Sequence, residues 1–258
     1  VFWHMPFSGS GFVKDIAGQC LRGIVQFGDN ASDGRVSSEG TRKLNASNLG
    51  NGALAIADIP DNDAHQIEKK SIPLGLNLVN MITSPTFNIM SESLSENERF
   101  SMFTLMRHPV NSVVSGYHHL SLINEKTRQM NLLEFAHTTK DNWVVRFFTS
   151  EPQEPLTMRH LEVAKEIMRR KVLVGIEDQP EDSMVRFERY FGWWDAVARD
   201  PDVLRCQKER FISAVGQNQH QEVQPGSQEF RTIATINWAD VQLYHYAREL
   251  FQEQGSLI

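Results

Sequence analysis

Short apolar runs alternate with longer amphipathic segments along most of the chain. Five runs have the length and composition of buried strands, at residues 1–5, 53–59, 76–83, 100–106 and 171–175. Apolar residues spaced three or four apart predict helices at residues 12–24, 110–123, 132–136, 142–148, 159–170, 183–191 and 238–254. Because strands alternate with helices, the pattern predicts a three-layer α/β/α domain with a central parallel sheet.

Residues 28–52 interrupt this pattern. The segment is rich in Ser, Asn, Gly and Asp and has almost no large apolar side chain. Such a composition is typical of an exposed, flexible insertion. Since the chain shows neither an internal repeat nor a second domain, we interpret residues 1–258 as a single domain carrying this insertion.

Charge and length limit the classes of ligand. The chain has 26 Lys and Arg against 32 Asp and Glu, a net charge of −6, which disfavours a general nucleic-acid-binding surface. An anionic ligand must therefore be held by a local site. No apolar run reaches the roughly 18 residues of a membrane span. Because Val1 already begins a strand-like run without a starting Met, we expect a longer precursor, with any membrane anchor outside this fragment.

The two cysteines, Cys20 and Cys206, lack the spacing of metal ligands. Free buried thiols are the favoured interpretation, with one long-range disulfide as the alternative. Two glycosylation sequons begin at Asn30 and Asn45 and would suit a secreted loop. Because about two such tripeptides are expected by chance, they add little.

A glycine-rich turn, Ser8-Gly9-Ser10-Gly11, lies between the first predicted strand and the first predicted helix. Backbone N–H groups in such a turn converge on one point, and the positive end of the helix dipole reinforces them. The turn therefore suits a phosphate or sulfate, although a purely structural turn is about as common. It completes neither the GxGxxG fingerprint nor the GxxxxGK[ST] loop, so dinucleotide binding and nucleotide hydrolysis are poorly supported.

A second strand-to-helix junction follows in "LMRHPVNSVVSGYHHL". Arg107 ends a predicted strand, and Pro109 suits the first turn of the next helix. Ser115 lies eight residues beyond Arg107, about two turns into that helix, so both side chains can grip one phosphate.

Together the two junctions resemble the P-loop-related carbohydrate sulfotransferases of the Golgi, of the heparan sulfate 2-O-sulfotransferase type. "PFSGSG" is similar to that family's "PKTGST"-like loop, and "LMRHPVNSVVSGY" to its "LRdPvxRxxSxY"-like segment, with Arg107, Pro109, Ser115 and Tyr117 in register. The segments "NWVVRFF", "KVLVGIEDQPEDSMVRFERYFGWW" and "INWADVQLYHYARELF" resemble later parts of the family. The similarity covers most of the chain apart from residues 28–52.

The resemblance implies a P-loop NTPase-like sulfotransferase fold and transfer of a sulfuryl group from 3′-phosphoadenosine-5′-phosphosulfate to a hydroxyl of a glycan or related acceptor. It implies that Phe7, Ser8, Gly9, Ser10 and Gly11 hold the 5′-phosphosulfate, that Arg107 and Ser115 hold the 3′-phosphate, and that no metal is needed. A lumenal Golgi domain of a membrane-anchored glycoprotein is expected. Since the chain is acidic, a neutral or lightly charged glycan suits it better than a highly sulfated polymer.

The sequence departs from the family at the catalytic positions. Phe7 replaces a lysine that neutralises the leaving phosphate, and losing such a donor costs about 3–4 kcal/mol of transition-state stabilisation. Lys14 is the candidate substitute, although a solvated helix lysine is the more common occurrence. Gly11 replaces a usual Thr or Ser. No histidine precedes Arg107 at the family's base position, so Glu92 is the candidate base.

Several alternatives stay open. Glu96 and Glu98 are further candidate bases, but the acidic segment that holds all three also fits a solvated helix face. His118 and His119 follow Tyr117 and can face an acceptor or simply lie at the surface. Because the expected lysine and histidine are missing, a protein that binds nucleotide or glycan without turnover is the alternative to an active sulfotransferase.

Overall fold

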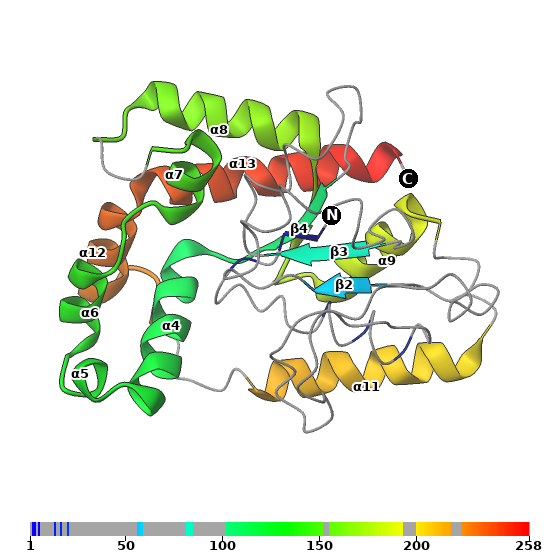
Figure 1. Ribbon diagram of the computed structural model, residues 1–258, viewed down its shortest axis with the longest axis horizontal. Coiled ribbons are helices and arrows are strands. Elements are labelled where there is room, and N and C mark those ends of the chain that lie inside the picture. Colours follow the sequence, from blue (N-terminus) through cyan, green and yellow to red (C-terminus); the bar gives the residue numbers. More distant parts are fainter. Residues whose placement is uncertain are drawn as a thin grey trace, which may run out of the picture.

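Five parallel strands among the described residues form a sheet at the centre of the protein (Figure 1). The computed structural model describes residues 2–3, 5, 13, 16, 20, 56–58, 81–84, 102–151, 155–192, 200–217 and 223–257. The strands are β1 (Phe2–Trp3), β2 (Ile56–Asp58), β3 (Met81–Ser84), β4 (Met102–Met106) and β5 (Val172–Ile176), in the order β2-β3-β1-β4-β5. Every neighbouring pair is parallel. The predicted mixed α/β class with a parallel sheet is confirmed.

Helices account for most of the described chain. They are α4 (Pro109–Ile123), α5 (Glu125–Arg128), α6 (Leu132–Thr138), α7 (Trp143–Thr149), α8 (Met158–Lys171), α9 (Pro180–Tyr190), α11 (Pro201–Gln217), α12 (Gln228–Ile236) and α13 (Trp238–Gln254). A 3₁₀ turn, η4 (Gly255–Leu257), follows α13. None of these described helices is both long and apolar enough to cross a membrane.

The hydrophobic pattern predicted α4, α6, α7, α8, α9 and α13 to within three residues at each end, but it missed α5, α11 and α12. Helix α11 was missed because its pattern is mixed over residues 201–212, where the structure describes the side chains: Val203 and Gln207 are buried, while Leu204 and Ile212 point to solvent. Helix α12 was missed because it is short and separated from α13 by a single residue, Asn237.

Helices pack on both faces of β4 and β5. Side chains alternate along a strand, so Met102 and Met106 join the core with α7, α8 and α13, whereas Phe103 and Leu105 join the core with α9 and α11. Figure 1 shows α8 and α13 on one side of the strands and α11 on the other. Both strands are buried along their whole length, which explains why they appear in the sequence as continuous apolar runs.

Strand β5 lies at one edge of the sheet, and side chains from two helices cover its free backbone. The Gln254 amide accepts a hydrogen bond from Val174 N–H at 2.9 Å and donates to the Val172 carbonyl at 2.9 Å. Ser183 Oγ accepts from Ile176 N–H at 2.9 Å. These pairing groups of the edge are therefore satisfied within the domain rather than left open to another chain.

Gly175 allows α9 to approach β5 closely. A Cβ atom at this position would lie 2.5 Å from Cζ of Phe187 and 3.0 Å from Cβ of Ser183. Any larger residue would therefore push α9 away from the sheet.

The N-terminal segment is anchored in the core below α9 and α11. Val13, Ile16 and Cys20 are buried, at the spacing that predicted a helix over residues 12–24. Cys20 forms a disulfide with Cys206 of α11, with a Cα–Cα distance of 5.5 Å. The favoured prediction of free thiols is therefore wrong. The sequence carries no sign of the bond, because the two cysteines are 186 residues apart and meet only where both segments pack on the same face of the sheet. The predicted insertion at residues 28–52 lies outside the described residues.

Candidate functional site

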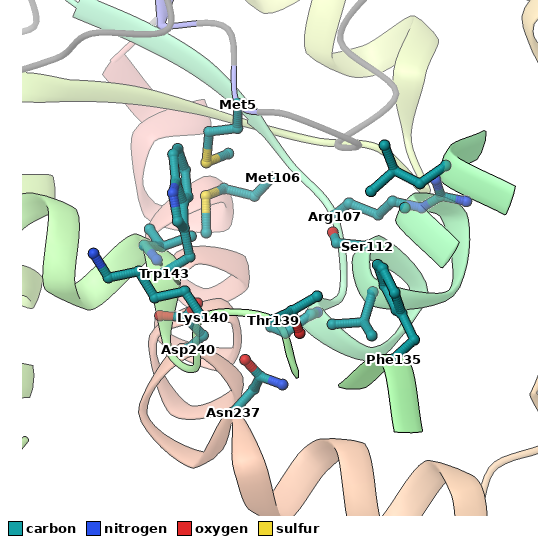
Figure 2. A pocket seen from close by; sticks show the side chains of 15 residues that line it. Met5, Met106, Arg107, Ser112, Phe135, Thr139, Lys140, Trp143, Asn237 and Asp240 are labelled. Atoms are coloured by element: carbon teal, nitrogen blue, oxygen red, sulfur yellow. Dashed lines mark hydrogen bonds between the residues drawn. The ribbon is translucent and has the colours of Figure 1, made fainter. Parts of the chain in front are cut away.

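A cavity of about 320 Å³ lies beyond the carboxyl ends of β1 and β4. Met5, just after β1, and Met106, the last residue of β4, form one wall (Figure 2). Trp143 and Lys140 lie on one side, with Phe135 and Ser112 on the other. The cavity thus opens where the sequence places both strand-to-helix junctions.

Helix α4 turns one face toward the cavity. Its lining residues recur at helical spacing: Pro109, Ser112, Val113, Gly116 and Leu120. His108 caps the helix, since its Nδ1 accepts a hydrogen bond from Val110 N–H at 3.3 Å. Proline at the first position is compatible with a helix start because no intrahelical partner is needed there. The sequence "RHPVNS" therefore fixes where the helix begins relative to Arg107.

Arg107 is buried in the cavity wall immediately after β4. Its Nε lies 3.3 Å from Oε2 of Glu177, and the two side chains are only 7% and 18% exposed. Glu177 follows β5, the neighbour of β4, and its N–H donates to the Met106 carbonyl at 2.8 Å. An anion bound at Arg107 would therefore share the guanidinium with a carboxylate already in place.

His108, next to Arg107, faces aromatic side chains. Its ring stacks on Phe230 with centroids 5.4 Å apart and meets the edge of Tyr244 at 5.2 Å. Burial, together with the nearby His245, lowers the pKa of His108. The imidazole is therefore neutral at neutral pH and adds no positive charge beside Arg107.

The opposite side of the cavity is built by two reciprocal helix caps. Asp240 of α13 accepts hydrogen bonds from Val144 N–H at 3.0 Å and Val145 N–H at 2.8 Å, at the start of α7. Asn142, just before α7, accepts in turn from Ala239 N–H at 2.7 Å at the start of α13. Each helix thus supplies the side chain that satisfies the other helix's first N–H groups.

Asn237 completes this junction. Its Oδ1 accepts from Asn142 N–H at 3.0 Å, and its Nδ2 donates to the Ile233 carbonyl at 3.0 Å. Asn142 adopts the left-handed conformation, with φ 47°, which asparagine tolerates better than most residues. Burial raises the pKa of Asp240 to about 7 despite the opposing backbone hydrogen bonds from Val144 and Val145.

Of the predicted site residues, the structure places Arg107 in the cavity wall. Ser115 is half-buried on α4 and belongs to a different side of the helix from the cavity-lining residues. The remaining predicted residues lie outside the described parts of the chain: Phe7, Ser8, Gly9, Ser10, Gly11, Lys14 and Glu92.

Three other residues of the second junction, Tyr117, His118 and His119, do not line the cavity. The Tyr117 hydroxyl donates to the Met130 carbonyl at 2.8 Å, which ties α4 to the turn before α6. His118 is half-buried and His119 exposed, and neither is among the residues that line the cavity.

Sequence reasoning missed Glu177, Ser112, Lys140 and Trp143. A signal for Glu177 was present, since it lies two residues beyond the predicted strand 171–175, as Arg107 lies at the end of the strand before it, and parallel neighbours align their carboxyl ends. Ser112 carried a weaker signal, one turn closer to Arg107 than Ser115. Lys140 and Trp143 precede or begin α7, and no local pattern relates that helix to β4.

The chain matches no protein-family model and no curated protein sequence. Among the described residues, no group of three or more His, Cys, Asp and Glu side chains is placed to hold a metal ion.

Proposed function

We propose that the protein transfers a sulfuryl group from 3′-phosphoadenosine-5′-phosphosulfate to a hydroxyl acceptor, on a P-loop NTPase-like sulfotransferase fold. The observation that carries the proposal is the place of Arg107. It is a buried cation at the carboxyl end of β4, beside the parallel strand β1 that leads into the glycine turn. Guanidinium groups and converging backbone N–H groups are the two common ways of holding a phosphate.

The order of the strands supports the same location. From β1 the chain passes to β2 and β3 on one side of the sheet, and then to β4 and β5 on the other. Open parallel sheets bind ligands beyond the carboxyl ends of their strands at such a switch point. The cavity lies there, since Met5 follows β1 and Met106 ends β4.

In the proposed reaction the acceptor oxygen attacks sulfur, the bridging S–O bond to the 5′-phosphate breaks, and adenosine 3′,5′-bisphosphate leaves. Arg107, with Ser115, holds the 3′-phosphate, and the N–H groups of residues 8–11 stabilise charge on the leaving phosphate. Glu92 takes the acceptor proton, and Lys14 supplies a cation in place of the lysine absent at Phe7. A glycan hydroxyl is the acceptor that the resemblance favours.

The Cys20–Cys206 disulfide supports the proposed location in the Golgi lumen, because such bonds persist in oxidising compartments. Membrane attachment, in this proposal, comes from a segment outside the present sequence.

A second candidate function is nucleotide binding without turnover. Phe7, in place of the expected lysine, favours it, because a phenyl ring offers no charge to the departing phosphate. A Phe7→Lys variant separates the two candidates in an assay of sulfate transfer. If transfer is measurable only in the variant, the natural protein is a binder; if the natural protein turns over, another cation replaces the lysine.

Calorimetry with adenosine 3′,5′-bisphosphate tests the common basis of both candidates. We expect binding by the natural protein and a loss of at least tenfold in affinity in Arg107→Gln, since a hydrogen bond to a charged group is worth about 1.5–3 kcal/mol. The control is Arg128→Gln, because Arg128 is exposed and pairs with Glu125 on the surface. An absence of binding by the natural protein, or equal affinities in the two variants, would contradict the proposal.

A further inference from the structure

We infer that the cavity between α4, α7 and α13 binds a compact apolar ring compound that carries a hydroxyl, such as a phenol or naphthol, rather than a sugar. Binding of this class of compound follows from the lining of the cavity. Its role as the sulfuryl acceptor rests in addition on the proposed function.

The surface that the cavity offers is mainly apolar. Met5, Met106, Val113, Leu120, Phe135 and Trp143 contribute side chains to it. Figure 2 shows the Trp143 indole beside the sulfur atoms of Met5 and Met106, with the Phe135 ring across the cavity. Flat aromatic walls and polarisable sulfur atoms favour an aromatic or other hydrophobic ring.

Most polar residues of the wall already have their hydrogen bonds inside the protein. Both carboxylate oxygens of Asp240 accept from backbone N–H groups of α7. The Asn237 side chain both accepts and donates at the same junction. Thr139 Oγ1 donates to the Ala136 carbonyl at 3.0 Å. A ligand therefore meets few polar atoms that still need a partner.

Arg107 also lines the wall, but its guanidinium meets the Glu177 carboxylate. Two further polar groups of the wall remain for a ligand. Among the described residues, neither the Ser112 hydroxyl nor the Lys140 ammonium has a hydrogen-bond partner. Ser112 lies on the inner wall formed by α4, whereas Lys140 is exposed at the rim. One inward hydroxyl suits a ligand with a single polar atom.

The small number of available polar groups distinguishes between the candidate ligands. A monosaccharide would bring several hydroxyl groups, and those without partners would lose their hydrogen bonds to water on entering. A purine base would lose its ring nitrogens' hydrogen bonds in the same way. The volume of about 320 Å³ is roughly twice that of a cavity of ~150 Å³ that holds benzene, so two fused rings match it in size.

The test uses 2-naphthol as the probe in equilibrium dialysis, with two matched variants of α4. Leu120→Trp places a large ring in the cavity, because Leu120 lines it. Leu122→Trp adds the same ring two residues further on, at a side chain that is 76% exposed. We expect at least a tenfold loss of naphthol affinity in Leu120→Trp and less than a twofold change in Leu122→Trp. Methyl glucoside should bind at least tenfold more weakly than 2-naphthol.

Equal naphthol affinity in the two variants, or glucoside binding as tight as naphthol binding, would overturn the inference. If Leu120→Trp does not fold, Trp143→Ala removes an aromatic wall instead of filling the space, and the naphthol affinity should still fall several-fold. Unchanged affinity in Trp143→Ala would count against the inference as well.

A competition titration separates this inference from the proposed function. Adenosine 3′,5′-bisphosphate should leave naphthol binding intact, since the nucleotide is assigned to Arg107 and residues 8–11, whereas naphthol is assigned to the apolar wall formed by Met106, Phe135 and Trp143. Displacement of naphthol would show that the cavity is the nucleotide's own site and would overturn the inference while leaving nucleotide binding in place. Naphthol binding without any nucleotide binding would sustain the inference and remove the proposed function.

Discussion

The α7–α13 junction and the β4–α4 junction both bring buried polar side chains to one cavity, yet they use them differently. At the first, Asn142 and Asp240 satisfy backbone N–H groups at the starts of two helices. At the second, Arg107 meets the carboxylate of Glu177, a partner from the next strand of the sheet. One junction joins two helices through side-chain caps of backbone N–H groups, and the other places two opposite charges at the carboxyl ends of adjacent strands.

The difference teaches how to interpret a polar residue in a cavity wall. Asp240 and Arg107 are both buried, so burial alone does not show which of them binds a ligand. The raised pKa of Asp240 would even favour Asp240 as a functional residue. The hydrogen-bond partners distinguish them, because Asp240 is already committed to the chain's own backbone. We therefore attribute the α7–α13 junction to stability and keep ligand binding at the β4–α4 junction as our proposal.

The largest expected effect is on stability at the α7–α13 junction. Asn142→Ala leaves the N–H groups of Ala239 and Asp240 without their acceptor and places alanine in a left-handed conformation. We expect the free energy of unfolding to fall by about 4 kcal/mol. Urea denaturation followed by circular dichroism measures the change.

The matched control is Asn131→Ala. Asn131 also caps a helix, α6, but it is exposed, so its loss should cost about 1 kcal/mol. Similar losses in the two variants would remove the distinction between a buried reciprocal cap and an ordinary one.

The second prediction concerns pH. Burial raises the pKa of Asp240 from its usual 3.8 to about 7, so between these values the folded protein holds a proton that the unfolded chain releases. Stability from this group is therefore present below pH 4 and is lost as pH rises through 7. Relative to Asp240→Asn, the free energy of unfolding of the natural protein should fall by about 4 kcal/mol between pH 4 and pH 8.

The readout is the difference in unfolding free energy between the two proteins across the pH range, which removes the contributions of other carboxyl groups. Glu188 provides a comparison in another part of the core, because burial also raises its pKa to about 7. Glu188→Gln should show the same sign. A difference independent of pH in Asp240→Asn would show that this carboxyl group does not titrate in the range.

The third prediction tests whether Glu177 competes with a bound nucleotide for Arg107 at the β4–α4 junction. Glu177→Gln removes the carboxylate that competes for Arg107, so we expect adenosine 3′,5′-bisphosphate to bind about fivefold more tightly, a gain of about 1 kcal/mol. Calorimetry measures the affinity, and Glu125→Gln, which breaks the exposed pair with Arg128, is the control. Weaker binding in Glu177→Gln would instead mean that the carboxylate holds Arg107 in position.

The smallest expected effects separate two serines of α4. Ser115→Ala should reduce nucleotide affinity about threefold, roughly 0.7 kcal/mol, as expected for one neutral hydrogen bond. Ser112→Ala should leave nucleotide affinity unchanged and weaken 2-naphthol binding, because Ser112 lines the cavity. The reverse assignment would place the nucleotide in the cavity.

The fold was predictable wherever a local pattern decided it. Helix α13 was predicted over Trp238–Gln254, the bounds that the structure has, because its apolar residues recur on one face. Strand β4 was predicted because both of its faces are buried. Helix α11 was missed because it buries the polar Gln207 while exposing Leu204 and Ile212. The Cys20–Cys206 disulfide was missed because it depends on two segments meeting in three dimensions.

Of the residues that form the candidate site, the sequence predicted only Arg107, at the junction between β4 and α4. Arg107 was found because a cation after an apolar strand is a local signal. Glu177 was missed because its relation to Arg107 depends on β4 and β5 being neighbours. Trp143 and Lys140 reach the cavity only because Asn142 and Asp240 dock α7 against α13, a contact between residues almost a hundred positions apart.

A crystal structure of the protein with adenosine 3′,5′-bisphosphate tests the central claim most directly, through one distance. We predict that an oxygen of the 3′-phosphate lies within about 3 Å of a guanidinium nitrogen of Arg107, with the 5′-phosphate at the N–H groups of residues 8–11. A nucleotide bound elsewhere, or one whose phosphates make no contact with Arg107, would contradict the account.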